Sequence, residues 1–156
     1  RNKPVLGFGR FAASAAYGTL AATDEIIAAD KMAEFGSVGA VITLDKAFLE
    51  FYAENFLTFY GEDAPNKNAE WRAAVSGNFG PMQERANEAT RKFQQQVSKQ
   101  RPISGSEAYQ RTTLSGAMFD AVEARRRGLV DGIGTMNYAD ARAIGWMQKG
   151  KKKKAA

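Results

Sequence analysis

The chain of 156 residues contains neither cysteine nor histidine. Without cysteine there are no disulfides, no thiol catalysis and no cysteine-ligated metals. Without histidine there is no Ser-His-Asp chemistry and the commonest zinc ligand is missing, so a hydrolase would take its general base from lysine or a carboxylate. A serine activated by lysine is therefore the leading option for nucleophilic catalysis.

Long hydrophobic runs are missing as well. No apolar stretch approaches the roughly 18 residues that a membrane span needs, and no secretory signal pattern is present. Hydrophobic residues make up 44% and charged residues 25% of the chain, which is ordinary for a globular protein. We expect a single domain over residues 1–148, with membrane contact only through residues upstream of Arg1.

The net charge of +5 depends on one short segment. Four of the lysines stand side by side in Lys151–Lys154, and without them the net charge is about +1. This pattern predicts a solvated, disordered basic tail over residues 149–156, with nucleic-acid binding only a minor alternative.

The rest of the chain is organised around residues 4–17, an apolar run that breaks at glycines and then becomes rich in alanine. It predicts a strand, a tight turn and a helix with Ser14 at its start. A serine at such a turn holds its hydroxyl beside the free N–H groups of the helix, which favour developing negative charge. Ser14 is therefore a candidate nucleophile, although simple helix capping is the commoner role of serine at this position.

The same stretch allows a second function. Residues 7–12 fit the G-x-G-x-x-[GA] fingerprint of dinucleotide-binding domains, and Asp30 follows at roughly the right distance after the apolar run 26–29. An NAD-binding domain is thus an alternative, although the second half of the chain is rich in helical patterns and offers few further βαβ units.

Further along, strands and helices alternate in a way that predicts an α/β layered fold rather than a helix bundle. Strands are expected at 26–29, after a glycine-flexed turn within 35–42, at 56–60 and at 129–130. Helices are expected from Asp45, which can cap, at 69–75, at about 81–99, at about 116–127, and at 138–147 with Asn137 as its cap. A polar loop is expected at 62–68.

Four landmarks, taken in order, resemble the signal peptide peptidase A family of serine-lysine peptidases, which includes protease IV and the related head proteases of tailed phages. They are Ala12–Tyr17 around the serine, the Gly36-Ser37-Val38-Gly39 turn, a lysine in a loop before helices, and the segment Ala124–Gly134. The similarity extends from about Lys3 to Ala143. It implies a crotonase-like α/β fold shared with the caseinolytic-type proteases, a ring or dome of subunits, and peptide-bond hydrolysis without a metal or cofactor.

The resemblance also assigns roles to individual residues. Ser14 matches the family's nucleophile, Lys67 its general base, and the Ala15 N–H one donor of its oxyanion hole. Gly36, Ser37, Val38 and Gly39 match the turn near the active centre, where they would position a peptide substrate. The family usually has Ser-Gly-Gly where this chain has Ser14-Ala15-Ala16, and its oxyanion-hole glycine and first strands would lie upstream of Arg1.

For Lys67 to accept a proton it must be neutral, and free lysine has a pKa near 10.4. We expect burial to lower this pKa by several units, with aromatic residues of 56–60 and Trp71 nearby and Ser37 holding the amine.

The resemblance leaves the substrate open. Substrates would be signal-peptide remnants, for a membrane-associated or extracytoplasmic enzyme, or phage head and scaffold proteins, in the virion or host cytoplasm. A capsid or assembly protein that keeps the fold without catalysis is a further alternative.

Overall fold

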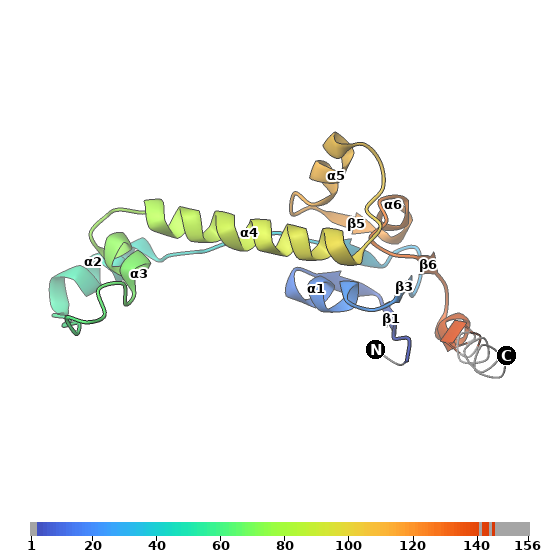
Figure 1. Cartoon of the computed structure of the whole chain (residues 1–156), viewed down its shortest axis with the longest axis horizontal. Helices are drawn as coiled ribbons and strands as arrows, with labels where there is room; N and C mark the ends of the chain where they lie inside the picture. Colours follow the sequence, from blue (N-terminus) through green and yellow to red (C-terminus); the bar gives the residue numbers. More distant parts are fainter. Residues whose placement is uncertain (1–2, 141, 144, 146–156) are drawn as a thin grey trace. The chain divides into compact units, whose positions relative to one another are not determined.

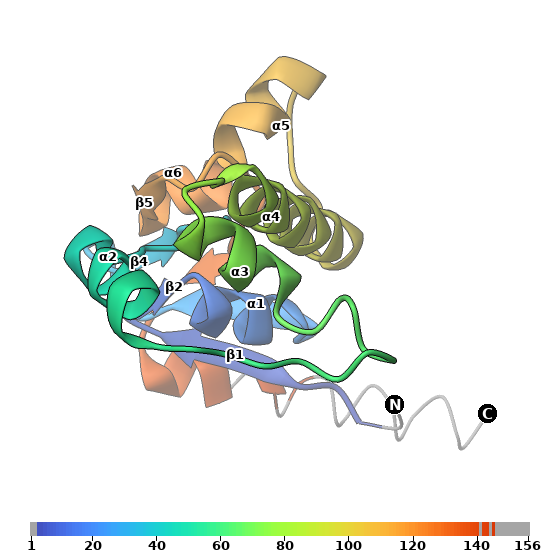
Figure 2. The same ribbon diagram turned by 90° about the vertical axis from the view of Figure 1, so that its left-hand side faces the viewer.

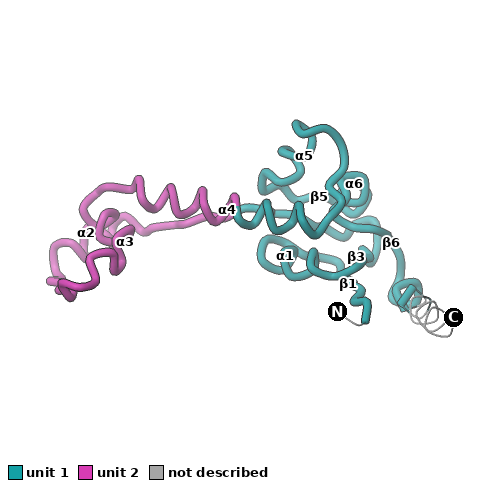
Figure 3. The backbone as a smooth tube through the Cα atoms, in the orientation of Figure 1, with its two compact units in different colours: residues 1–39, 92–156 teal, residues 40–91 magenta. Residues whose placement is uncertain are grey.

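The computed structural model describes residues 3–140, 142, 143 and 145 (Figure 1). The chain divides into two compact units, unit 1 formed by residues 1–39 and 92–156 and unit 2 formed by residues 40–91 (Figure 3). Unit 2 is therefore an insertion between two parts of unit 1. The single domain expected over 1–148 stays a prediction, and the expected basic tail at 149–156 lies outside the described residues.

Unit 1 is a mixed α/β structure. Its first part contains β1 (Leu6–Gly9), β2 (Phe11–Ala13), α1 (Ala15–Ala21), β3 (Glu25–Ala28) and β4 (Glu34–Gly36). Its second part contains the C-terminal half of α4 (Gly80–Gln100), then α5 (Glu107–Thr113), β5 (Met118–Asp120), α6 (Ala121–Arg126) and β6 (Gly132–Ile133), and residues 136–140 are helical. The α/β class expected from the sequence is confirmed at this coarse level.

The strands of unit 1 form two three-stranded sheets. One has the order β1-β3-β6 and is parallel throughout. The other has the order β2-β4-β5, with β2 and β4 parallel and β4 and β5 antiparallel. In the second sheet Ala13 pairs with Gly36 and Gly36 with Met118, so the end of β2, the end of β4 and the start of β5 lie side by side.

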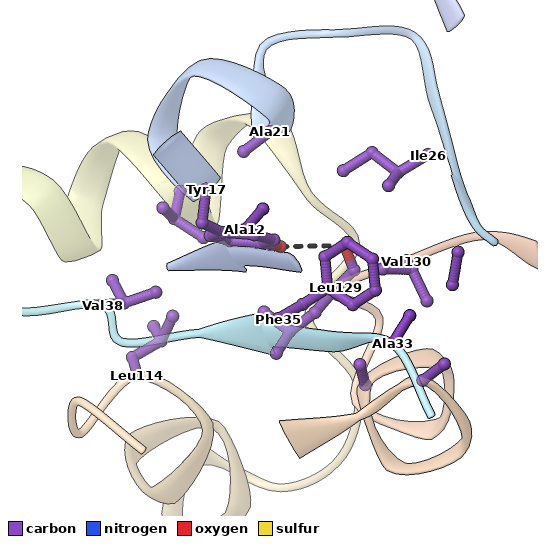
Figure 4. Packing of buried hydrophobic residues seen from close by; sticks show 14 residues of the cluster. Ala12, Tyr17, Ala21, Ile26, Ala33, Phe35, Val38, Leu114, Leu129 and Val130 are labelled. Atoms are coloured by element: carbon purple, nitrogen blue, oxygen red, sulfur yellow. Dashed lines mark hydrogen bonds between the residues drawn. The ribbon is translucent and has the colours of Figure 1, made fainter. Parts of the chain in front are cut away.

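The core of unit 1 packs α1, α4 and α6 against these strands. Tyr17, Ile26, Phe35 and Leu129 are fully buried (Figure 4), and so is Val97 of α4. The hydroxyl of Tyr17 donates to the carbonyl of Leu129 at 2.8 Å, and burial raises the pKa of this phenol. Helix α1, which follows Ser14, is therefore anchored to a segment more than a hundred residues away.

One ion pair joins three parts of unit 1. Asp131 Oδ2 accepts from Arg101 Nη2 at 2.6 Å and from the N–H of Ile26 at 2.7 Å, while the N–H of Asp131 donates to the carbonyl of Ile26 at 2.9 Å. The Arg101 side chain is 2% exposed. Asp131 thus fixes the end of α4 and the loop before β6 onto β3.

Unit 2 contains α2 (Lys46–Asn55), α3 (Ala69–Val75) and the N-terminal half of α4. Helices α2 and α3 of this unit are labelled in Figure 2. The carboxylate of Asp45 accepts from the N–H of Phe48 at 3.0 Å, which confirms the expected cap. Rings of Phe48, Tyr52 and Trp71 contact one another, yet the only hydrophobic residues buried among the described residues of this unit are Leu49 and Ala74.

Several expectations from the sequence are confirmed. The strand at 26–29 corresponds to β3, the helix at 69–75 is α3 with the same bounds, and the long helix at 81–99 is α4. The polar loop at 62–68 contains no helix or strand. These predictions succeed because each rests on a local pattern in the sequence. The pattern is a pair of isoleucines for β3, a helical period for the two helices and a cluster of turn residues for the loop.

Others are wrong in position. The strand expected after the turn in 35–42 precedes it as β4, because Gly36 and Ser37 bend the chain directly after the pairing with β2. The strand expected at 129–130 lies at 132–133, where pairing with β3 is available. Residues 56–60 form no strand, since no other strand pairs with them in the described chain.

The helix expected at 116–127 is replaced by β5 and the shorter α6, because residues 118–120 pair with β4. The last helix is capped by Thr135, whose hydroxyl accepts from the N–H of Tyr138 at 3.4 Å, and not by Asn137. None of the described helices is long and apolar enough to cross a bilayer.

Candidate active site

Ser14 occupies the sharp turn between β2 and α1, as the sequence predicted. Its backbone has φ 52° and ψ −125°, a conformation that non-glycine residues rarely adopt. Its hydroxyl makes no capping hydrogen bond, and the side chain is exposed. The simple capping role is therefore not what the hydroxyl performs here.

Ser106 provides a comparison within the same molecule. It stands at the same position before α5, which like α1 has seven residues. Its backbone is relaxed, with φ −65° and ψ 163°, and its hydroxyl accepts from the N–H of Tyr109 at 3.4 Å. An ordinary cap in this chain thus differs from Ser14 both in backbone conformation and in the use of the hydroxyl.

The surrounding fold holds Ser14 in its unfavourable conformation. The N–H of Ser14 donates to the carbonyl of Gly36 at 3.0 Å, and its carbonyl accepts from the N–H of Gly18 at 2.9 Å. Ala12 and Tyr17, on either side, are buried in the core. Backbone strain of this kind costs about 1–3 kcal/mol and is concentrated at functional sites, including the strand-to-helix turns that carry serine nucleophiles.

Ala15 is the first residue of α1 and is exposed beside Ser14. The first N–H groups of a helix have no acceptor within the helix. In the described part of the chain no other group accepts from the Ala15 N–H either. This N–H is therefore available for the role that the resemblance gives it, one of the two donors of an oxyanion hole, which stays a prediction.

The Gly36–Gly39 turn lies next to Ser14. Gly36 has φ 136°, and a Cβ at this position would stand 2.4 Å from the carbonyl oxygen of Ala117. Ser37 also has a positive φ of 56°, and its N–H donates to the same oxygen at 2.8 Å. Val38 is buried. Gly36 thus connects Ser14 on one side to Ala117 on the other, and only glycine fits there.

Replacing Gly36 by alanine is expected to lower the free energy of unfolding by about 2–4 kcal/mol, because of the contact with Ala117 and the positive φ. Urea unfolding followed by circular dichroism measures this loss. Gly9 is the matched control, since nothing lies within 4 Å of a Cβ added there. Equal stability of Gly36→Ala and Gly9→Ala would contradict the close approach.

Ala117 was missed by reasoning from the sequence. The segment around it was assigned to a helix, whereas it is the carbonyl of Ala117 that accepts from Ser37. The residue that could have shown the end of the helical pattern here is the adjacent Gly116, which has φ 91°.

Lys67 lies in an exposed turn of unit 2, directly before α3. Its N–H donates to the carbonyl of Ala64 at 3.1 Å. The aromatic rings expected to bury Lys67 pack elsewhere, Trp71 against Tyr52 and Tyr60 under the guanidinium of Arg72. Within unit 2 the desolvation expected of Lys67 is therefore absent.

The predicted residues thus fall into two groups. Ser14, Ala15 and the Gly36–Gly39 turn are brought together in unit 1, whereas Lys67 belongs to unit 2. The pairing of Lys67 with Ser14, and that of Ser37 with Lys67, stay predictions.

The dinucleotide fingerprint at residues 7–12 does not form the structure that such a site needs. Gly7 and Gly9 lie within β1, and residues 11–13 continue into a second strand instead of opening a helix. Gly7 accommodates the side chain of Leu20, whose Cδ1 would be 2.6 Å from an added Cβ. Gly7 therefore serves the packing of α1 on β1, and residues 7–12 open no helix whose N-terminus could receive a pyrophosphate.

Across residues 3–140 and the few described beyond them, no three acidic side chains gather in a way that could hold a metal ion. No family model matches the chain, and no curated protein is significantly similar to it. The resemblance to the signal peptide peptidase A family accordingly stays a prediction that rests on the four landmarks.

Proposed function

We propose that the protein is a serine endopeptidase that hydrolyses peptide bonds with a Ser14–Lys67 dyad on a crotonase-like fold. The observation that carries the proposal is the conformation of Ser14, an exposed serine with an uncommitted hydroxyl on a strained strand-to-helix turn. The absence of histidine and cysteine from the chain leaves lysine as the base of choice.

In the proposed reaction, Ser14 Oγ attacks the carbonyl carbon of the scissile bond while its proton passes to the neutral amine of Lys67. The tetrahedral intermediate collapses as the ammonium of Lys67 returns the proton to the leaving nitrogen, which breaks the peptide bond and leaves an acyl-serine. Water then attacks the ester, with Lys67 again as base, and the carboxylic acid is released.

The oxyanion of each intermediate would accept from the Ala15 N–H. The resemblance assigns the second donor to a glycine of the family that none of the four landmarks contains. Substrates would be extended peptides positioned beside the Gly36–Gly39 turn, where main-chain pairing presents a scissile bond. Signal-peptide remnants or phage head and scaffold proteins are the substrate classes we propose, and no metal or cofactor enters the reaction.

The proposal requires that Lys67 lose the solvent that surrounds it in unit 2. Contact with the Ser14 region would do this, because removal from water disfavours the ammonium and lowers the lysine pKa. Such a contact can arise within one chain or between subunits of the proposed ring or dome.

Labelling with a fluorophosphonate tests the proposal. We expect one phosphonyl adduct on the peptide that contains Ser14, and none in Ser14→Ala. Ser106→Ala is the matched control, because Ser106 occupies the same position before a helix of the same length and should be irrelevant to labelling. Labelling that persists in Ser14→Ala, or its absence from a correctly folded wild type at every pH between about 6 and 10, would contradict the mechanism.

A non-catalytic capsid or assembly protein is the second candidate. The observation that favours it is the exposure of Lys67 together with the large apolar surface of unit 2. A folded wild type that associates with itself but takes no fluorophosphonate would support this function over the first.

A further inference from the structure

The two residues that follow Ser14 limit the room that a substrate has beside the hydroxyl. Ala15 and Ala16 are the first two residues of α1, and both are exposed. We infer that their methyl groups select substrates with a small, uncharged residue, such as glycine, alanine or serine, on the acyl side of the scissile bond. The inference rests on the proposed function of Ser14 and adds a substrate preference to it.

The first argument is the direction of the methyl groups. Every Cα–Cβ bond of an α-helix is tilted toward the N-terminus of the helix. The methyl groups of Ala15 and Ala16 therefore lean toward the turn that holds Ser14, where the acyl group of a substrate would be attacked. Because both residues are exposed, the described chain leaves the space in front of these methyl groups open to a substrate.

The second argument is that α1 has little freedom to move away from a bulky substrate. On the inner side of the helix, Tyr17 and Ala21 are fully buried, and the Tyr17 hydroxyl donates to the Leu129 carbonyl at 2.8 Å (Figure 4). Gly18 lies so close to α4 that a Cβ added to it would stand 2.8 Å from Cε2 of Phe93. Close-packed interiors resist displacements of the size of a methyl group. The two exposed methyl groups therefore keep their positions when a substrate binds.

The third argument is the absence of charge around Ser14. Residues 11–19, 35–39 and 113–119 meet at the turn, because β2 pairs with β4 and β4 pairs with β5. None of the residues in these three segments is charged. A charged substrate residue that lost its water here would find no counter-charge in these segments, which costs free energy. An uncharged residue avoids this cost.

These observations set the size of the expected preference. One methyl group in a rigid binding site changes kcat/KM for competing substrates by about 10–200-fold. Removing the methyl groups should therefore increase cleavage after large residues much more than cleavage after small ones.

Cleavage of a peptide library, with the cleaved bonds identified by mass spectrometry, tests the inference. The wild type is expected to cleave mainly after glycine, alanine and serine. In the double variant Ala15→Gly with Ala16→Gly, the ratio of cleavage after leucine to cleavage after alanine should rise by about 10–200-fold. Glycine keeps the backbone N–H groups, so the proposed oxyanion donor is still present.

Ala108→Gly is the matched control. Ala108 is the exposed second residue of α5, which like α1 has seven residues and follows a serine. The substitution weakens a helix in the same way as Ala16→Gly but at a distance in sequence from Ser14. It should leave the ratio of cleavage after leucine and after alanine unchanged.

The outcomes separate this inference from the proposed function. A wild type that cleaves after leucine as readily as after alanine would overturn the inference and leave the peptidase intact. A double variant with the wild-type ratio, or a ratio that rises equally in Ala108→Gly, would overturn it as well. A folded wild type that cleaves no peptide and takes no fluorophosphonate would remove both the inference and the proposed function.

Discussion

Replacing Asp131 by asparagine is expected to lower the free energy of unfolding by about 3–5 kcal/mol, the largest effect on stability that we predict for a single substitution. The asparagine keeps the shape of the side chain but removes its charge. The guanidinium of Arg101, 2% exposed, then stays buried without a counter-ion. The Nε of Arg101 already lacks a hydrogen-bond partner among the described residues. Other contacts of the guanidinium therefore compensate little for the loss of the carboxylate.

The same substitution weakens a second contact. The carboxylate of Asp131 accepts from the N–H of Ile26 at 2.7 Å, in the middle of the core strand β3. A carboxylate is a stronger acceptor than an amide oxygen, so part of the loss arises at this bond. Urea unfolding followed by circular dichroism gives the free energy directly.

A double-mutant cycle distinguishes the ion pair from a general disturbance of the loop. Arg101→Met alone should also destabilise, since it leaves the carboxylate without its cation, but adding it to Asp131→Asn should cost little more. If the two losses simply add, the pair is not the source of the stability.

Replacing Lys67 by methionine is expected to reduce peptide hydrolysis and fluorophosphonate labelling at Ser14 by at least about 10³-fold. The reason is that Ser14 then has no group to receive its proton. Because Lys67 is exposed in its turn, the same substitution should leave the free energy of unfolding within about 0.5 kcal/mol of the wild type. The expected signature is thus a loss of reactivity without a loss of stability.

Two further variants sharpen this experiment. Lys67→Arg should not restore reactivity, because a guanidinium stays protonated and cannot act as a base. Lys46→Met is the matched control, an exposed lysine of the same unit that lies 4.0 Å from Glu50. Labelling of Lys67→Met at the wild-type rate, with Ser14 still the labelled residue, would remove lysine from the mechanism.

The sequence predicted those features whose causes are local. The helix start at Ser14 could be found because an apolar run, two glycines and a run of alanines follow one another within fourteen residues. The bounds of α3 could be found because a polar loop precedes it and Gly77 follows it. What the sequence could not reveal at Ser14 is the backbone strain, since that is imposed by pairing with Gly36 and by the buried Tyr17.

Features that depend on distant partners were missed or misplaced. Residues 118–120 carry a helical pattern but become β5, because β4 offers an edge on which they pair. Residues 56–60 carry a strand pattern, but no strand of the described chain pairs with them, so they form no strand. The prediction that nearby aromatic rings bury Lys67 fails within unit 2 for a related reason. The aromatic residues close to Lys67 in sequence pack on α2 and on Arg72 instead.

The anchoring of β3 to Asp131 has a consequence for synthesis on the ribosome. The two residues joined by this contact are 105 positions apart, and at about 5–20 residues per second the second one emerges roughly 5–20 s after the first. During that interval the nascent chain presents β1 and β3 without β6. The apolar side chains of the insertion, residues 40–91, are also exposed at that stage. Efficient production of this protein should therefore depend on chaperones that shield hydrophobic nascent chains, and slow or chaperone-poor translation should yield aggregates.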